Sequence, residues 1–207
     1  MTRLLVTMFC LMAMPITAAN ASIVVFDFST GGAAGAALDG TNGASFTDVG
    51  SGVTIQVDTT TSFATGTGSV FNAIGSGAGV DTTGVTSGGG DEASQIDVEE
   101  TLKFTLTFTG VATLQEIDFS SFGSAGEELT ADVAGTLFTL GTADVDGDQD
   151  WNANGGLSIS SGDMITLSAN VGEYRLGSLT LDVTAIPEPA SLMMFGSAML
   201  LGIRRRR

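Results

Sequence analysis

The stretch Thr101-Leu-Lys-Phe-Thr-Leu-Thr-Phe-Thr109 alternates apolar and polar residues without a break. One set of alternate positions holds only large apolar side chains, which are Leu102, Phe104, Leu106 and Phe108. The other set holds threonine hydroxyl groups and the ammonium group of Lys103. Successive side chains of a strand point to opposite faces, so this pattern predicts a β-strand with one face in a core and one in water.

Shorter runs of the same kind lie on both sides of this strand, separated by glycine-rich turns. After Gly110 we expect a returning strand with Leu114, Ile117 and Phe119 inward and a bulge near Gln115. The other predicted strands are Ile23–Phe28, Val53–Val57, Leu129–Val133, Thr136–Leu140, Gly156–Ile159, Met164–Ala169 and Tyr174–Val183. Roughly ten short strands at this spacing predict an all-β fold, an antiparallel, jelly-roll-like β-sandwich.

Two segments have no clear alternation. We interpret Thr30–Gly35 as a coil, with a short helix as the alternative reading. The region Thr59–Asp91 is rich in glycine and threonine, and we interpret it as long loops around one or two short strands. No helix is predicted between the two terminal segments.

The first 21 residues have the three parts of a secretory signal peptide. Arg3 gives the positive start, Leu4–Ile16 is the apolar part, and Ala19-Asn20-Ala21 is an A-x-A site for signal peptidase. Cleavage after Ala21 would make Ser22 the first mature residue, and Thr17-Ala18-Ala19 is a weaker alternative site. The segment therefore predicts export by the general secretion machinery, with residues 1–21 forming a signal-peptide helix.

The last 22 residues contain a motif, an apolar run and a basic end, in that order. The motif is Pro187-Glu188-Pro189, in which the prolines favour an extended backbone that displays Glu188. Ala190–Ile203 carries no charge, and the chain ends in four basic residues, Arg204, Arg205, Arg206 and Arg207. Such a basic block resists translocation and favours the cytoplasmic side of a membrane.

This tail resembles the PEP-CTERM sorting tail of exported bacterial proteins, which some domain collections label an ice-binding protein C-terminal domain. The resemblance implies recognition by an exosortase, an integral-membrane cysteine transpeptidase that cuts near Pro-Glu-Pro. It also implies a transient inner-membrane intermediate and then a place in the cell envelope, on the cell surface or in the extracellular matrix. A weaker resemblance of Gly90–Asp97 and the strand after it to passengers of such tails implies only a β-sandwich.

The chain thus divides into a signal peptide at residues 1–21, a β-sandwich passenger at 22–185 and a sorting tail at 186–207. As a helix, the fourteen residues of Ala190–Ile203 would be about 21 Å long, against about 30 Å for the hydrocarbon core of a bilayer. We therefore expect a short membrane-associated helix that spans only with help from flanking residues or local thinning. A signal that is later cleaved tolerates this better than a permanent anchor.

The composition of the passenger excludes several classes of function. It has two basic residues, Lys103 and Arg175, against twenty-two acidic ones, a formal net charge of −20 that repels nucleic acid. The chain has no histidine, and its single cysteine, Cys10, lies in the signal peptide. Ser-His-Asp triads, thiol catalysis and thiolate zinc sites are therefore excluded, which leaves carboxylate chemistry.

One acidic loop has oxygen ligands at alternate positions, namely Asp144, Asp146, Asp148 and Asp150. Such carboxylates can converge on a calcium ion, and the loop partly resembles the Asp-x-Asp-x-Asp loops of dockerins and EF-hands. It departs from them because Gln149 replaces the turn glycine and Gly155 replaces the twelfth-position glutamate. An irregular calcium loop and a solvated acidic turn remain the two readings.

A second acidic group flanks the Thr101–Thr109 strand and consists of Asp91, Glu92, Asp97, Glu99 and Glu100. We interpret it either as part of a calcium site or as charge that protects a sheet edge from pairing with other chains.

Sugar chemistry is a further alternative. A glycosidase needs two carboxylates across a cleft and usually aromatic platforms, but Trp151 and Tyr174 are the only Trp and Tyr residues. Trp151 could instead stack on a sugar in a carbohydrate-binding module, or pack half-buried. We therefore expect a noncatalytic exported protein that acts structurally or by weak adhesion, within exopolysaccharide, with carbohydrate binding and a carboxylate-dependent hydrolase as the alternatives.

Overall fold

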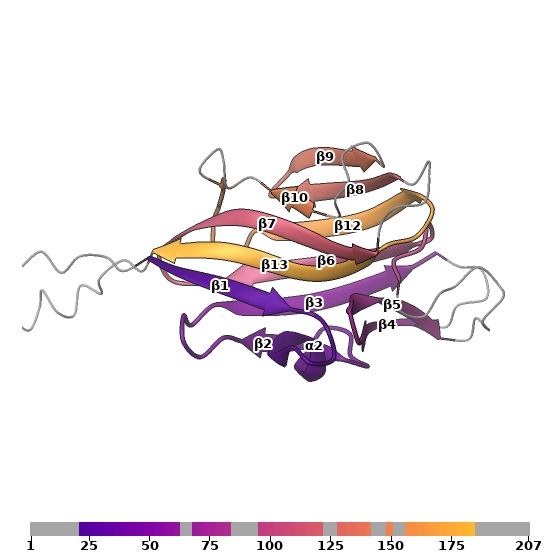
Figure 1. Ribbon diagram of the computed structural model, residues 1–207, viewed down its shortest axis with the longest axis horizontal. Coiled ribbons are helices and arrows are strands. Elements are labelled where there is room, and N and C mark those ends of the chain that lie inside the picture. Colours follow the sequence, from indigo (N-terminus) through magenta and orange to yellow (C-terminus); the bar gives the residue numbers. More distant parts are fainter. Residues whose placement is uncertain are drawn as a thin grey trace, which may run out of the picture. The chain divides into compact units, whose positions relative to one another are not determined.

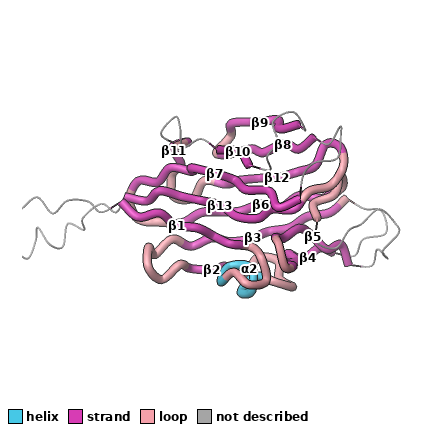
Figure 2. The backbone as a smooth tube through the Cα atoms, viewed as in Figure 1, coloured by secondary structure: helices cyan, strands magenta, loops and turns pink. Residues whose placement is uncertain are grey.

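The protein is all-β, as predicted, and its strands form two antiparallel sheets (Figures 1 and 2). The only helix in the part of the chain described here is α2, Ala33–Leu38. The structure is a computed structural model that describes residues 21–62, 68–83, 95–121, 128–141, 148–150 and 156–184.

The first sheet contains seven described strands. Five of them follow the order β10-β7-β13-β5-β4, while β1 also pairs with β13, and β11 with β7. Their bounds are β1 Ala21–Asp27, β4 Gly68–Ile74, β5 Gly77–Thr83, β7 Val111–Ser121, β10 Asp148–Asp150, β11 Leu157–Ile159 and β13 Arg175–Thr184.

The second sheet contains six described strands in the order β2-β3-β6-β12-β8-β9. Their bounds are β2 Ser45–Thr47, β3 Thr54–Thr61, β6 Glu100–Thr107, β8 Glu128–Val133, β9 Thr136–Gly141 and β12 Met164–Val171. In this order β6 is a central strand, because it pairs with β3 on one side and with β12 on the other.

Strand β6 confirms the alternation that the sequence showed. The side chains of Leu102, Phe104 and Leu106 are fully buried, whereas the polar residues between them are half-buried or exposed. On the outer face, Lys103 Nζ lies 3.4 Å from Asp58 Oδ2 of β3. The strand therefore contributes its apolar face to the core and its polar face to the surface.

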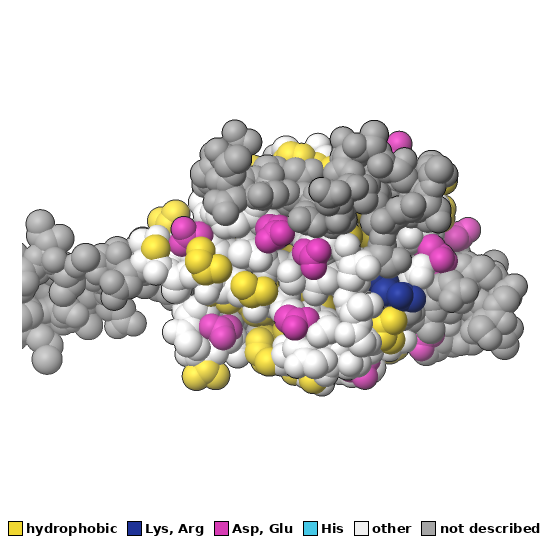
Figure 3. Space-filling view, viewed as in Figure 1, with side chains coloured by type: hydrophobic (Ala, Val, Ile, Leu, Met, Phe, Trp, Pro, Cys, Tyr) yellow, Lys and Arg dark blue, Asp and Glu magenta, His cyan; other side chains and the backbone are white. Residues whose placement is uncertain are grey.

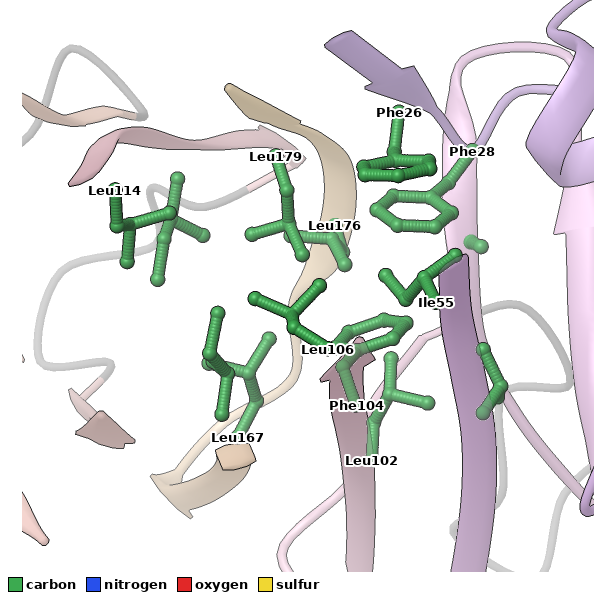
Figure 4. Close-up of a cluster of buried hydrophobic side chains, with 14 of the residues drawn as sticks. Phe26, Phe28, Ile55, Leu102, Phe104, Leu106, Leu114, Leu167, Leu176 and Leu179 are labelled. Atoms are coloured by element: carbon green, nitrogen blue, oxygen red, sulfur yellow. The ribbon is translucent and has the colours of Figure 1, made fainter. Parts of the chain in front are cut away.

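The core lies between the two sheets, which is the arrangement of a β-sandwich (Figure 4). The ring of Phe28, which follows β1, stacks on Phe104 of β6 at a centroid distance of 5.0 Å. Phe26 of β1 meets Phe46 of β2 edge to face at 6.2 Å. Aromatic pairs in these arrangements add to the stabilisation from buried area, so they hold the two sheets together.

The predicted bulge at Gln115 is confirmed. Thr180 of β13 pairs with Glu116 while Leu181 pairs with Leu114, which leaves Gln115 between them without an opposite residue. The expected return of β7 along β6 is wrong, because the two strands belong to different sheets. Gly110, at a φ of 121°, lies in the short connection that takes the chain from one sheet to the other.

The segment after β1 is not a coil throughout. Helix α2 begins at Ala33, and Ala34 and Leu38 are buried against the core. A six-residue helix gains little from its own hydrogen bonds, so packing rather than local propensity stabilises it. This is why the alanine- and glycine-rich sequence gave no clear signal.

The region predicted as long loops around one or two short strands contains a hairpin of two seven-residue strands, β4 and β5. Its second strand lacks an alternating pattern because Gly77 and Gly79 occupy positions where a side chain would overlap neighbours. A Cβ atom on Gly79 would overlap the backbone of Gln95, and one on Gly77 would overlap Ser120 Oγ. Close backbone approach therefore replaces the apolar pattern here.

Candidate functional site

The two ends of the sandwich domain lie side by side in one pair of strands. Ala21 at the start of β1 pairs with Thr184 at the end of β13, and Ser22 pairs with Val183. In Figure 1, β1 and β13 run next to each other in opposite directions. The predicted signal-peptidase site ends at Ala21, and Pro187 is the third residue after Thr184. The two predicted processing sites therefore flank the same pair of strand ends.

This pair of strand ends is well anchored. Val24 of β1 is buried opposite Leu181 of β13, which is also buried, and Val183 is buried next to the end of β13. Further along, Phe26 pairs with Leu179, and both side chains lie in the core. Separating the first residues of β1 from the last residues of β13 would expose these apolar side chains, so the junctions are held by packing as well as by hydrogen bonds.

Most of the predicted sorting and cleavage residues lie outside the described residues. These are Ala19, Pro187, Glu188, Pro189, Arg204, Arg205, Arg206 and Arg207. The predicted signal-peptide helix and C-terminal helix lie outside them as well. Among the helices that the structure describes, none is long and apolar enough to cross a membrane.

The predicted calcium loop is described only in part. Asp144, Asp146 and Trp151 lie outside the described residues, whereas Asp148 and Asp150 begin and end β10. The register of β10 on β7 sets Asp148 opposite Asp118 and Asp150 opposite Glu116. No group of three or more metal-ligating side chains occurs within the described ranges. Calcium binding by the loop stays a prediction.

The second acidic group has a structural role in its described part. Asp97 and Glu100 are 4% and 1% exposed. The Thr82 hydroxyl donates to Glu100 Oε1, and the Asp97 N–H donates to Oε2 of the same carboxylate at 3.2 Å. The Glu100 N–H donates in turn to the Asp97 carbonyl oxygen at 2.9 Å. The Glu100 carboxylate thus ties β5 to the turn that precedes β6.

The prediction that these acids protect a sheet edge is wrong for Glu100. Its strand, β6, has a neighbour on both sides, and Glu100 points into the protein. The sequence did contain the signal for this orientation. Extending the alternation of Leu102 and Phe104 back by two residues sets Glu100 on the buried face, where a carboxylate needs hydrogen-bond partners.

A surface hollow of about 240 Å³ lies at the turns that follow β8 and precede β12. Its lining includes the carboxylates of Asp132 and Asp163. Each carboxylate accepts a turn N–H, Asp132 from Gly135 at 2.9 Å and Asp163 from Ser160 at 2.7 Å. Both acids therefore have a turn-stabilising role of the kind typical of aspartate in loops.

The outer face of the second sheet is rich in hydroxyl groups. Thr54 of β3 lies opposite Thr107 of β6, and Thr60 lies opposite Thr101. The row continues across β12 and β8, where Ser168 lies opposite both Thr101 and Thr130. These side chains are half-buried or exposed. The polar residues of the alternating strands therefore form a surface of hydroxyl donors and acceptors around the Asp58–Lys103 ion pair.

Among the residues that the structure describes, Asp48 and Tyr174 have pKa values that depart from the usual range. Hydrogen bonds from the Ser51 hydroxyl and N–H lower the pKa of Asp48, and those bonds fix the turn between β2 and β3. Burial raises the pKa of Tyr174 well above its usual value, because the phenolate would have to form away from water. Neither group lies beside the strand ends that carry the predicted processing sites.

Comparison with known proteins assigns one part of the chain. No curated protein and no solved structure matches the sequence. Residues 185–207 match the family model described as the PEP-CTERM protein-sorting motif. This span begins directly after Thr184, the last residue of β13. The chain therefore carries a PEP-CTERM protein-sorting motif that starts where its final described strand ends.

Proposed function

We propose that this protein is a noncatalytic component of the cell envelope or extracellular matrix, exported with a signal peptide and sorted by an exosortase through its tail. The match of residues 185–207 to the PEP-CTERM motif supports the sorting step. That motif implies an exported, envelope-directed protein processed by an exosortase. The rest of the proposal rests on how the domain holds its two ends.

The pairing of Ser22 with Val183, directly beside both junctions, suggests how processing and folding fit together. In this proposal, signal peptidase cuts after Ala21 while the apolar run and the four arginines hold the other end in the inner membrane. The domain then folds with β1 against β13, so its processed end faces the membrane. Exosortase cuts near Pro187-Glu188-Pro189 and transfers the jelly-roll-like passenger to its final place.

The proposal of a noncatalytic role has support from the acids whose contacts are known. Glu100, Asp132 and Asp163 hold turns or neighbouring strands together. The absence of histidine from the sequence, and of cysteine from residues 22–185, removes the commonest bases and nucleophiles. In this proposal the domain acts through contacts that its surface makes with other matrix components, and not through catalysis.

A second candidate function, adhesion to neutral polysaccharide, is favoured by the hydroxyl-rich face of the second sheet. Threonine and serine hydroxyl groups both donate and accept hydrogen bonds, as sugar hydroxyl groups do. A neutral glycan also avoids the repulsion that the passenger charge of −20 exerts on acidic polymers. Multiple weak contacts along a polymer add up to useful avidity.

The first experiment measures the intact mass of the protein from wild-type cells and from an exosortase-deletion strain. We expect the wild-type protein to begin at Ser22 and to lack Arg204–Arg207, and the deletion strain to retain the arginines in its membrane fraction. Full-length tails in both strains would contradict the sorting proposal.

The adhesion candidate is tested by co-sedimentation with exopolysaccharide from the same host. Replacing Thr101 and Thr105 with lysine puts two charges on the hydroxyl-rich face and should reduce binding several-fold. The same change at Ser178 and Thr180, on the outer face of the first sheet, is the control. Equal binding by both variants would argue against this face.

A further inference from the structure

Strand β1 is an edge strand whose outer side has an unusual exposed surface. Within the described residues, it pairs with β13 and with no other strand. Ile23 and Val25 project from it with 64% and 56% of their surface exposed. Figure 3 shows apolar side chains among acidic ones on the face that β1, β13 and β7 present. Exposed apolar edge strands are prone to pair with another chain.

The backbone of β1 is also open for pairing. The Phe28 N–H donates to the Gly177 carbonyl oxygen at 3.0 Å, which continues the β1–β13 register. In an antiparallel pair, residues that bond the partner strand alternate with residues whose N–H and C=O point the other way. Ile23 and Val25 are in the second set. No other described segment makes a backbone hydrogen bond to them.

We propose that the β1 edges of two copies of this protein pair antiparallel about a two-fold axis at Val24, forming a dimer with a continuous sheet. In this register Ile23 of one copy lies opposite Val25 of the other, and the reverse pair forms by symmetry. Both exposed apolar side chains of each copy then pack on the same face. A self-complementary contact of this kind is what a two-fold dimer requires.

The charges along β1 permit this register. Asp27 is the only charged residue of the strand, and a two-fold axis at Val24 sets it level with Ala21 of the other copy, so no two acids face each other. Gly32 packs against the Asp27 carbonyl oxygen, so that a Cβ atom there would overlap it. The pairing therefore spans Ser22–Phe26 of each copy and ends where the segment before α2 covers the strand.

Processing adds one attraction, and this step rests on the proposed cleavage after Ala21. Ser22 lies opposite Phe26 of the other copy in this register, so its new α-ammonium group would lie next to Asp27 of that copy. Asp27 Oδ1 already accepts the Ser29 N–H at 2.9 Å, which fixes the carboxylate at the end of the strand. An opposite charge at this point offsets part of the repulsion between two domains of charge −20.

The dimer is tested with the full chain carrying Cys10→Ser, expressed in its own host and purified after processing. One preparation carries Ile23→Cys and the other Val25→Cys. Mixed under a mild oxidant, they should form the mixed disulfide faster than either forms a disulfide with itself. Leu137→Cys is the matched control, because Leu137 is 69% exposed on β9, the edge strand of the other sheet.

Sedimentation equilibrium supplies the second readout and needs no oxidant. We expect the mass of two copies for the unmodified protein, of one copy for Val25→Lys, and of two copies for Leu137→Lys. Raising the ionic strength from about 0.01 M to about 0.15 M shortens the Debye length from about 30 Å to about 8 Å. The dimer should therefore strengthen with salt.

Three results would overturn the dimer. They are a single-copy mass at every concentration, equal cross-linking through Leu137→Cys, and a Val25→Lys variant that still has the mass of two copies. The Asp27 contact is judged separately. Asp27→Asn should weaken the dimer several-fold at low salt. Unchanged dimerisation would show that the contact between Ser22 and Asp27 contributes nothing, and it would not affect the register found by cross-linking.

Discussion

The backbone of Ala21 pairs with the backbone of Thr184, so the first residue of β1 and the last residue of β13 are direct neighbours in one sheet. One strand follows the predicted signal-peptidase site, and the other directly precedes the residues that match the sorting motif. An enzyme that acts at either junction after the domain has folded must therefore approach the same end of the β1–β13 strand pair.

Because the sorting motif lies so close to the end of β13, we expect the rate of tail removal to depend on the length of the linker between Thr184 and Pro187. Ala185 and Ile186 alone separate β13 from Pro187, and two extended residues reach at most about 7 Å. Inserting six Gly/Ser residues after Thr184 should therefore speed tail removal in a pulse-chase experiment, because exosortase would no longer have to meet the end of the sheet. A two-residue insertion should give an intermediate rate. Equal rates for all three chains would indicate cleavage before β13 folds.

The buried carboxylate of Glu100 predicts a specific loss of stability. Glu100→Ala removes the acceptor of the Thr82 hydroxyl and of the Asp97 N–H. The Thr82 hydroxyl can then donate to Thr61 Oγ1, which lies 3.0 Å away. Removing the acceptor of the buried Asp97 N–H costs about 1–3 kcal/mol, so the free energy of unfolding should fall by that amount in urea titrations. Glu99→Ala is the matched control, because Glu99 is the exposed neighbour. Equal losses for the two variants would show that the buried contacts contribute nothing.

The sequence predicted those strands whose side chains alternate, and the structure explains why it missed others. Leu102, Phe104 and Leu106 face the core directly, so their pattern is visible in the sequence. One or two short strands were expected in Thr59–Asp91, but β5 could not be placed because Gly77 and Gly79 pack closely against neighbouring atoms where other strands carry side chains. The three-residue strands β2 and β10 were not predicted, whereas β11, which is equally short, was predicted within Gly156–Ile159.

The strand pairing and the candidate site were harder to predict than the strands. The alternation in β6 and β7 indicates which side chains are buried. Each sheet of a sandwich buries one face, so this pattern does not indicate to which sheet a strand belongs. The sequence therefore could not show that Gly110 connects two sheets. The sorting motif, in contrast, is a linear signal read from consecutive residues, and the match to residues 185–207 confirms that prediction. That Ala21 lies beside Thr184 depends on the fold.

The close approach at Gly79 predicts that even one methyl group destabilises the hairpin. Gly79→Ala would place a Cβ atom against the backbone of Gln95, which cannot move as a flexible side chain can. Overpacking of this kind costs about 1–3 kcal/mol. Gly75→Ala in the adjacent turn is the matched control, because a Cβ atom there meets nothing within 4 Å. Thermal unfolding followed by circular dichroism compares the two, and equal melting temperatures would refute the contact.

The buried phenol of Tyr174 predicts a loss of stability at alkaline pH. Burial holds its pKa in the folded state well above the ordinary value near 10, whereas the unfolded chain ionises near 10. Below about pH 10 both states keep the proton. Above it the unfolded state releases the proton first, so stability falls as pH rises, by up to about 1.4 kcal/mol per pH unit.

The same residue supplies the control and the direct readout. Tyr174→Phe keeps the ring that meets Phe119 edge to face at 5.4 Å but cannot ionise. The difference in the free energy of unfolding between the two proteins should therefore be constant below about pH 10 and change above it. Because Tyr174 is the only tyrosine, tyrosinate absorbance follows its ionisation alone. The phenolate should appear together with unfolding, and its appearance near pH 10 in a protein that is still folded would show that water reaches the hydroxyl group.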